Sequence, residues 1–105
     1  MNVALLAGSV LLMSGCAGLA QTGSVTKAYD RYKHGAYEAT LSLITQAETL
    51  GTVTPELKAE LTYLRAMTYG QLDQKESAYT LFEYLKEQHE DSQYGYLAAM
   101  RLEQR

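Results

Sequence analysis

The spacing of the apolar residues constrains the fold of this chain more than any other feature. From Val25 onward, apolar side chains recur at intervals of three and four residues rather than alternating, which is the pattern of helices that bury one face. Pro55 is the one proline of the sequence. A chain of 105 residues has room for one domain. The sequence therefore predicts a single all-α domain.

Glycines and capping residues divide this stretch into five predicted helices. Gly35 and Gly51 favour helix ends, because glycine readily adopts the left-handed backbone of a C-terminal cap. Thr54 before a proline favours a helix start, as does Asp73, which has Glu76 three residues later in the manner of a capping box. The predicted helices cover about 25–34, 36–50 and 55–71, followed by two more that start after Asp73 and after Asp91 or Ser92.

The N-terminus carries an uncharged apolar run, residues 3–13, which ends beside a cysteine. The run is too short to span a bilayer as a helix and fits the apolar core of a secretory signal peptide. Met13-Ser14-Gly15-Cys16 resembles the lipobox of bacterial lipoproteins, at which the cysteine receives a diacylglycerol group and the chain is cut before it. The resemblance implies a signal peptide over 1–15 and a lipidated Cys16. The alternative is a buried apolar helix with an incidental cysteine.

On that resemblance, residues 16–24 form the lipidated cysteine and a tether. Residues 17–24 are small and mostly polar and would span roughly 16 Å as a flexible chain. A single acyl chain binds a membrane only marginally, whereas the two or three chains of a mature lipoprotein hold firmly. Gram-negative lipoproteins retained in the inner membrane usually have an aspartate after the cysteine, and this chain has Ala17. The resemblance therefore implies an outer-membrane anchor with the protein facing the periplasm.

The helical stretch contains an internal repeat. Residues 63–67, Tyr-Leu-Arg-Ala-Met, and residues 96–100, Tyr-Leu-Ala-Ala-Met, match at four of five positions with an offset of 96 − 63 = 33 residues, the period of repeats made of helix pairs. An earlier copy aligns at an offset of 38, which sets Gly35 against Asp73. The sequence therefore predicts stacked helix hairpins.

Small and aromatic residues in these repeats resemble the tetratricopeptide signature. Its small and aromatic positions correspond to Ala66, Tyr69, Ala78 and Phe82, and its turn between helices to residues 35–38. Over residues 25–105 the resemblance implies antiparallel hairpins in a right-handed stack of about two and a half repeats, which share one core because a lone hairpin cannot bury its own apolar face. The alternative is a generic bundle of five helices.

In tetratricopeptide proteins the first helix of each pair lines a concave groove that binds a peptide or a partner helix. Carried over residue by residue, the groove positions are Tyr29, Tyr32, Tyr63, Met67, Tyr96 and Met100. Rigid rings with a polar tip and adaptable thioethers suit such a surface. The sequence has nine tyrosines, one phenylalanine and no tryptophan, which favours half-exposed aromatic surfaces. The alternative is that these side chains simply pack between helices.

Charge and motifs argue against other classes of function. The net charge of −3 includes no block of like charges, which argues against nucleic acid as the main partner. His34 and His89 have no ligand spacing with each other or with Cys16, so neither a metal nor a cofactor is predicted. No phosphate-binding loop or nucleophile motif is found, so the sequence predicts no enzyme. Carboxylate pairs four residues apart are interpreted as solvated surface groups: Glu56 with Glu60, and Glu83 with Glu87.

The sequence therefore predicts a lipid-anchored adaptor that binds a protein partner in its groove. Similar lipoproteins with these repeats support outer-membrane barrel assembly, pilus or secretin assembly, and polysaccharide export. The alternative function is structural, with the lipoprotein forming a homo-oligomer through the outer face of its last helix. That face is predicted to include Leu97 and Leu102.

Overall fold

The computed structural model describes the backbone of residues 2–105 and the side chains of residues 16–105. Over this part of the chain there are five helices and no strand, so the all-α prediction is confirmed. The helices are α1 (Asn2–Lys33), α2 (Tyr37–Thr49), α3 (Pro55–Gln71), α4 (Lys75–Gln88) and α5 (Gln93–Glu103).

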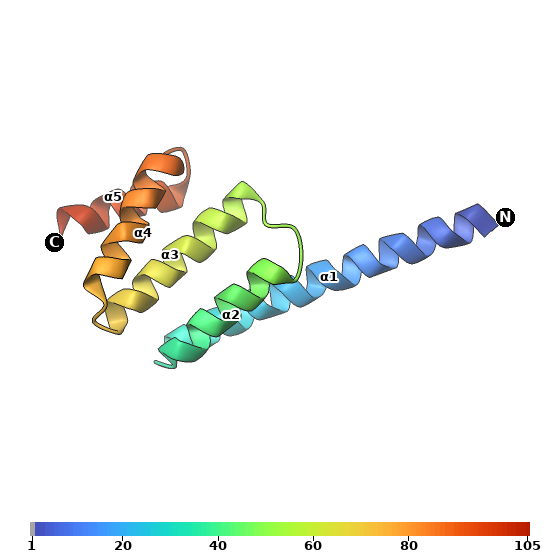
Figure 1. Cartoon of the computed structure of the whole chain (residues 1–105), viewed down its shortest axis with the longest axis horizontal. Coiled ribbons are helices and arrows are strands. Elements are labelled where there is room, and N and C mark those ends of the chain that lie inside the picture. Colours follow the sequence, from blue (N-terminus) through green and yellow to red (C-terminus); the bar gives the residue numbers. More distant parts are fainter. Residues whose placement is uncertain (1) are drawn as a thin grey trace.

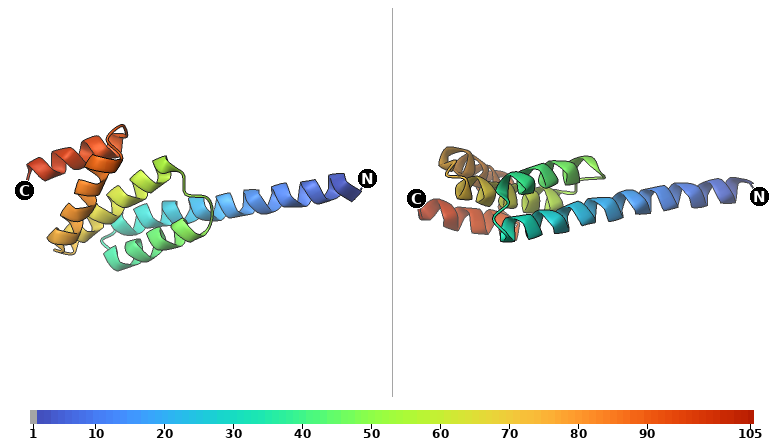
Figure 2. Two further views of the ribbon diagram at one scale, coloured as in Figure 1. Left: turned by 45° about the horizontal axis from the view of Figure 1, so that its top comes forward. Right: turned by 90° about the horizontal axis from the view of Figure 1, so that it is seen from below.

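Consecutive helices pack side by side in opposite directions. α1 and α2 form one antiparallel pair, α3 and α4 form a second, and α5 packs on α4 and touches α3 (Figures 1 and 2). α1, α3 and α5 run in broadly the same direction in Figure 1. α3 contacts α1, α2, α4 and α5. The other helices are therefore arranged around it.

Two apolar clusters form the core, and α3 contributes to both. The N-terminal cluster lies between α1, α2 and α3 and consists of Ala28, Ile44, Ala47, Leu61 and Leu64. The C-terminal cluster lies between α3, α4 and α5 and consists of Ala59, Ala66, Ala78, Phe82, Leu85 and Ala98. Four of its six members are alanines, and such small side chains let the helices approach closely.

Two of the predicted helix starts are confirmed by their caps. The Thr54 hydroxyl accepts a hydrogen bond from the Leu57 amide at 3.1 Å, and the Ser92 hydroxyl accepts one from the Gly95 amide at 3.1 Å. Each cap satisfies an amide that has no partner within its helix. α3 and α5 therefore begin where local sequence chemistry places them.

The predicted cap of α4 is wrong. Gln74 holds the N-cap position without a side-chain hydrogen bond, while Asp73 has a φ of 59°. Asp73 instead ends α3, in the left-handed conformation that the aligned Gly35 adopts with a φ of 79°. In both turns the next amide reaches back five residues, from Ala36 to Arg31 at 2.8 Å and from Gln74 to Tyr69 at 2.9 Å. The two turns that the offset of 38 residues aligns therefore have the same backbone conformation.

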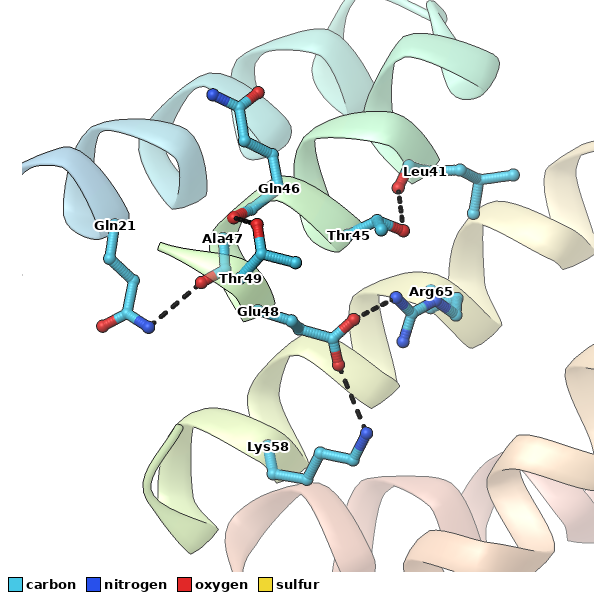
Figure 3. A network of polar contacts seen from close by, with 9 residues as sticks. All are labelled: Gln21, Leu41, Thr45, Gln46, Ala47, Glu48, Thr49, Lys58 and Arg65. Atoms are coloured by element: carbon cyan, nitrogen blue, oxygen red, sulfur yellow. Dashed lines mark hydrogen bonds and ion pairs between the residues drawn. The ribbon is translucent and has the colours of Figure 1, made fainter. Parts of the chain in front are cut away.

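The predicted start of the first helix at Val25 is also wrong, because α1 continues through residues 16–24. The Gln21 side chain donates to the carbonyl of Ala47 at 3.0 Å and to that of Thr52 at 3.1 Å, and Figure 3 shows the first of these bonds. Ser24 is buried. Part of the expected tether therefore packs against α2, and α1 projects beyond it toward the N-terminus (Figure 1).

The signal peptide predicted over 1–15 falls on residues whose side chains lie outside the described part. Cys16 is exposed on α1. A search of the described residues finds no helix with the length and apolarity needed to cross a bilayer. Lipidation of Cys16 stays a prediction.

Candidate functional site

One side of α3 lies at the edge of the C-terminal cluster, against which Tyr63 and Met67 pack as partly buried side chains. Glu56, Glu60, Tyr63 and Met67 follow one another at three- and four-residue steps, which places them on one side of the helix. All four are half-buried or exposed. Tyr29 of α1 and Tyr94 of α5 border this side. We call the surface made by Tyr29, Glu60, Tyr63, Met67 and Tyr94 the open face.

A carboxylate with tyrosine neighbours lies at the centre of the open face. The Tyr29 hydroxyl donates a hydrogen bond to Glu60 Oε2 at 2.8 Å. Burial, with the hydrogen bond and negative charge of Glu60, raises the pKa of Tyr29 far above its usual range. Burial and then the charge of Glu60 also raise the pKa of Tyr94. Both hydroxyls are therefore uncharged at neutral pH, and the site has a net negative charge at Glu60.

Aromatic contacts connect this centre to the core. The Tyr63 ring lies 5.7 Å from that of Tyr94 and 5.8 Å from that of Phe82, both in tilted arrangements. Such pairs add favourable energy beyond the area they bury. The Tyr63 ring thus connects Tyr94 of α5 to Phe82 of α4 and joins the open face to the C-terminal cluster.

The turn before α5 fixes the position of Tyr94. Gly95 is buried, and a Cβ added to it would collide with the backbone carbonyl of His89. Only glycine allows α5 to approach this turn so closely. The Ser92 cap and Gly95 therefore determine where Tyr94 meets Tyr63.

A hollow opens at the other end of the open face. It has a volume of ≈ 290 Å³ and is lined by parts of α3, α4 and α5, including Met67, Tyr79 and Phe82. Lys75 and Arg101 also line it. The open face therefore changes along α3 from an acidic centre at Glu60 to a hollow with a mixed polar and apolar lining that includes two basic residues.

The structure brings some of the predicted groove residues together and separates others. Tyr29 and Tyr63 both lie beside Tyr94, and Met67 follows one turn later on α3. Tyr32 is half-buried, packs on the N-terminal cluster, and has its ring 5.6 Å from that of Tyr37.

Tyr96 and Met100 do not join the open face. They are 66% and 42% exposed and lie on the side of α5 opposite the buried Ala98. The repeat aligns Tyr96 with Tyr63, which packs against Phe82 of α4. Within the described residues no helix follows α5, so the equivalent side of α5 has no helix packed on it.

The sequence analysis missed Glu60 and Tyr94. Glu60 was interpreted as a solvated surface group; its bond to Tyr29 is exposed to solvent, but the residue is half-buried. Glu56, its partner in that pair, is exposed as expected. Glu83 of the second pair is half-buried like Glu60 and accepts a hydrogen bond from Arg105. Tyr94 could have been found from the repeat, since 94 − 33 = 61 and Leu61 is fully buried. An inward-facing tyrosine at the edge of the predicted groove was therefore already encoded in the alignment.

Comparison of the chain with protein-family models, curated proteins and solved structures gives no match. Within residues 16–105 no three His, Cys, Asp or Glu side chains are grouped as metal ligands. His34 lies beside Asp30, and the His89 ring contacts that of Tyr84 at 5.5 Å. We therefore identify the open face as the candidate site from its geometry alone.

Proposed function

We propose that this chain is a protein-binding adaptor whose open face captures a segment of a partner protein. The observation that carries this proposal is the half-exposed row formed by Tyr29, Tyr63 and Tyr94 around Glu60. Tyrosine side chains give large contact areas at low entropic cost and keep a hydrogen-bonding tip. The row is held in place by its own packing, so little ordering is needed when a partner binds.

The proposal includes a tetratricopeptide-like stack and a lipid anchor. Antiparallel hairpins, the matching turns at Gly35 and Asp73, and the common direction of α1, α3 and α5 support the stack. The lipobox-like residues before Cys16 support the anchor. The adaptor then sits on the outer membrane, faces the periplasm and serves envelope assembly, in the barrel, pilus or secretin, or export machinery.

Site-specific crosslinking tests partner capture. The full-length chain is expressed in a Gram-negative host beside a Tyr29→Ala, Met67→Ala double variant and a Tyr84→Ala control. Tyr84 is a comparably exposed tyrosine on α4, away from the open face. We expect a specific crosslinked protein with the wild type and the control, and its loss with the double variant. Equal crosslinking by all three would refute the open face as the binding site.

Membrane fractionation tests the anchor separately. The wild type is expected in the outer membrane, and Cys16→Ala is expected to be released or left unprocessed. Unchanged location and processing of Cys16→Ala would mean that the lipobox prediction is wrong.

The alternative function is self-association through the outer side of α5. The exposed Tyr96 and Met100 favour it, although Leu102, which was expected on that face, packs against the C-terminal cluster instead. Sedimentation at increasing protein concentration separates the two functions. Self-association predicts a rising mass that a Tyr96→Glu variant abolishes, whereas the adaptor proposal predicts a constant mass for both.

A further inference from the structure

Half-buried carboxylates are few in this protein, and two of the three have a cation. Among residues 16–105, the half-buried acidic residues are Glu48, Glu60 and Glu83. Glu48 accepts hydrogen bonds from Arg65 at 2.5 Å and from Lys58 at 3.2 Å (Figure 3). Glu83 accepts one from Arg105 at 3.2 Å. Both carboxylates are therefore neutralised within the chain.

Glu60 is the exception. No lysine, arginine or histidine of residues 16–105 forms an ion pair with it. Its hydrogen-bond donor is the neutral hydroxyl of Tyr29. A carboxylate partly removed from water loses hydration that a neutral donor replaces only in part. Glu60 is therefore a negative charge whose compensation within the chain is incomplete.

The surroundings of Glu60 suit an organic cation. The Tyr29 hydroxyl lies on the carboxylate, Tyr94 is near enough for the charge of Glu60 to raise its pKa, and the Tyr63 ring packs beside that of Tyr94. Aromatic faces attract ammonium and guanidinium groups, and the attraction strengthens where water is partly excluded. Tyr29 is 39% exposed, so a side chain arriving from solvent has access to the site.

We propose that Glu60 and its tyrosine neighbours bind a lysine or arginine side chain of the partner protein. This inference rests on the proposed function for the source of the basic side chain, but the cation site itself can be tested without the partner. The carboxylate supplies the charge and the tyrosine rings supply the faces on which the alkyl stem and the cation lie. A basic residue of the partner thereby sets where its segment sits along α3.

A titration with small probes tests the site directly. Backbone amide signals of the isotope-labelled full chain are followed by NMR while N-acetyl-lysine amide or the uncharged N-acetyl-norleucine amide is added. We expect the lysine probe to shift the signals of Tyr29, Glu60 and Tyr94 in a saturable way. Glu60→Gln should weaken this binding about tenfold, the size of one charge-assisted contact. Glu56→Gln makes the same charge change one turn away at an exposed position and should leave binding unchanged.

A Tyr84→Phe variant and the urea midpoint of Glu60→Gln guard against a purely structural explanation. Tyr84 is exposed on α4, away from the open face, so its variant should bind the lysine probe like the wild type, and Glu60→Gln should unfold at the same urea concentration as the wild type. Equal shifts from the lysine and norleucine probes, or equal lysine binding by Glu60→Gln, would overturn the cation site. Partner crosslinking that survives Glu60→Gln but is lost in the Tyr29→Ala, Met67→Ala variant would overturn it while leaving the adaptor function intact. Lysine binding through Glu60 without any crosslinked partner would support the cation site and refute the adaptor.

Discussion

The two carboxylates that lie against α3 have opposite surroundings. Glu48 of α2 bonds to Arg65 and Lys58 of α3, so its charge joins two helices. Glu60 of α3 itself bonds to a tyrosine hydroxyl and has no cation among the described residues. The ion pairs of Glu48 join α2 to α3 and help to hold the fold together. Glu60 instead keeps a negative charge on an accessible surface.

The pKa values reflect this difference. Burial opposes ionisation of Glu48, but the hydrogen bonds and charges of Arg65 and Lys58 lower the pKa of its carboxyl below the ordinary value. At the open face the same kind of charge, on Glu60, instead helps burial to raise the pKa of Tyr29. One carboxylate is stabilised by its neighbours, while the other makes its neighbours harder to ionise. Glu48 is a structural group in a part-buried ion pair, and Glu60 is a candidate receptor whose hydrogen bond to Tyr29 is exposed to solvent.

The largest expected effect comes from separating α5 from the open face. Gly95→Ala places a Cβ against the His89 carbonyl and should destabilise the protein by at least about 2 kcal/mol, since backbone cannot give way cheaply. Urea unfolding of the full chain measures it. Gly70→Ala is the matched control, because a Cβ there meets nothing and should slightly stabilise α3. Equal stability of the two variants would mean that α5 does not depend on this close approach.

Removing Arg65, one of the two cations paired with Glu48, should have the next largest effect. Arg65→Met takes the shortest ion pair from Glu48 and is expected to cost about 1–3 kcal/mol, because a partly buried charge loses a charge-assisted hydrogen bond. Glu60→Gln should change stability by less than about 0.5 kcal/mol. Chemical denaturation of both variants measures the contrast. A greater loss in Glu60→Gln would reverse our assignment of structural and receptor roles.

The pH dependence of stability should follow Glu48. Because its folded pKa is lowered, its contribution is present above the unfolded pKa of about 4.3 and is lost as the pH falls through the lower, folded value. The loss should be smaller than that of Arg65→Met, since a protonated carboxyl still accepts a hydrogen bond. Denaturation curves of the wild type and Glu48→Gln between pH 6 and 3, taken as a rough window around that pKa, should converge toward acid. Parallel curves would count against the ion pair.

The smallest expected change concerns the turn between α3 and α4, which touches neither carboxylate. Asp73 adopts a positive φ that glycine adopts without strain, so Asp73→Gly should stabilise the protein by about 0.5–1 kcal/mol. Gly35→Ala should destabilise the protein by a similar amount, because alanine is strained at the positive φ of this turn. The added Cβ makes no contact that could offset the strain, since no atom lies within 4 Å of it. Thermal unfolding measures both. Lysine-probe binding should stay unchanged in Asp73→Gly, and a change would show that this turn affects the open face.

Sequence reasoning succeeded where local chemistry decides the structure. Thr54 was expected as a cap and is one, and of the two candidates Asp91 and Ser92 it is Ser92 that caps α5. Asp73 was assigned to the wrong helix, because aspartate suits both an N-cap and a left-handed helix end. The start of α1 was missed because small polar residues look like a linker, whereas the packing of Gln21 on α2 is a tertiary contact that the local sequence does not reveal.

The candidate site was predictable only in part, for a similar reason. The tetratricopeptide resemblance implied Tyr29, Tyr63 and Met67 as groove residues, and these three lie on the open face. It placed Tyr96 by alignment with Tyr63, but Tyr63 is partly covered by α4 and Tyr96 has no such neighbour. The burial of Glu60 depends on how near α1 and α5 come to α3. The spacing of residues along one helix gives no information on the distance between α3 and its neighbours α1 and α5.

The continuity of α1 couples Cys16 to the open face by rotation. Cys16, Gln21 and Tyr29 stand on one uninterrupted helix, so each residue inserted between Cys16 and Gln21 would turn Cys16 by about 100° around the helix axis. Four inserted residues would return Cys16 to nearly the same angle around the helix axis, and would place it about 6 Å farther from Gln21. The number of helical residues between Cys16 and Tyr29 therefore sets the direction in which the open face points relative to an anchor at Cys16.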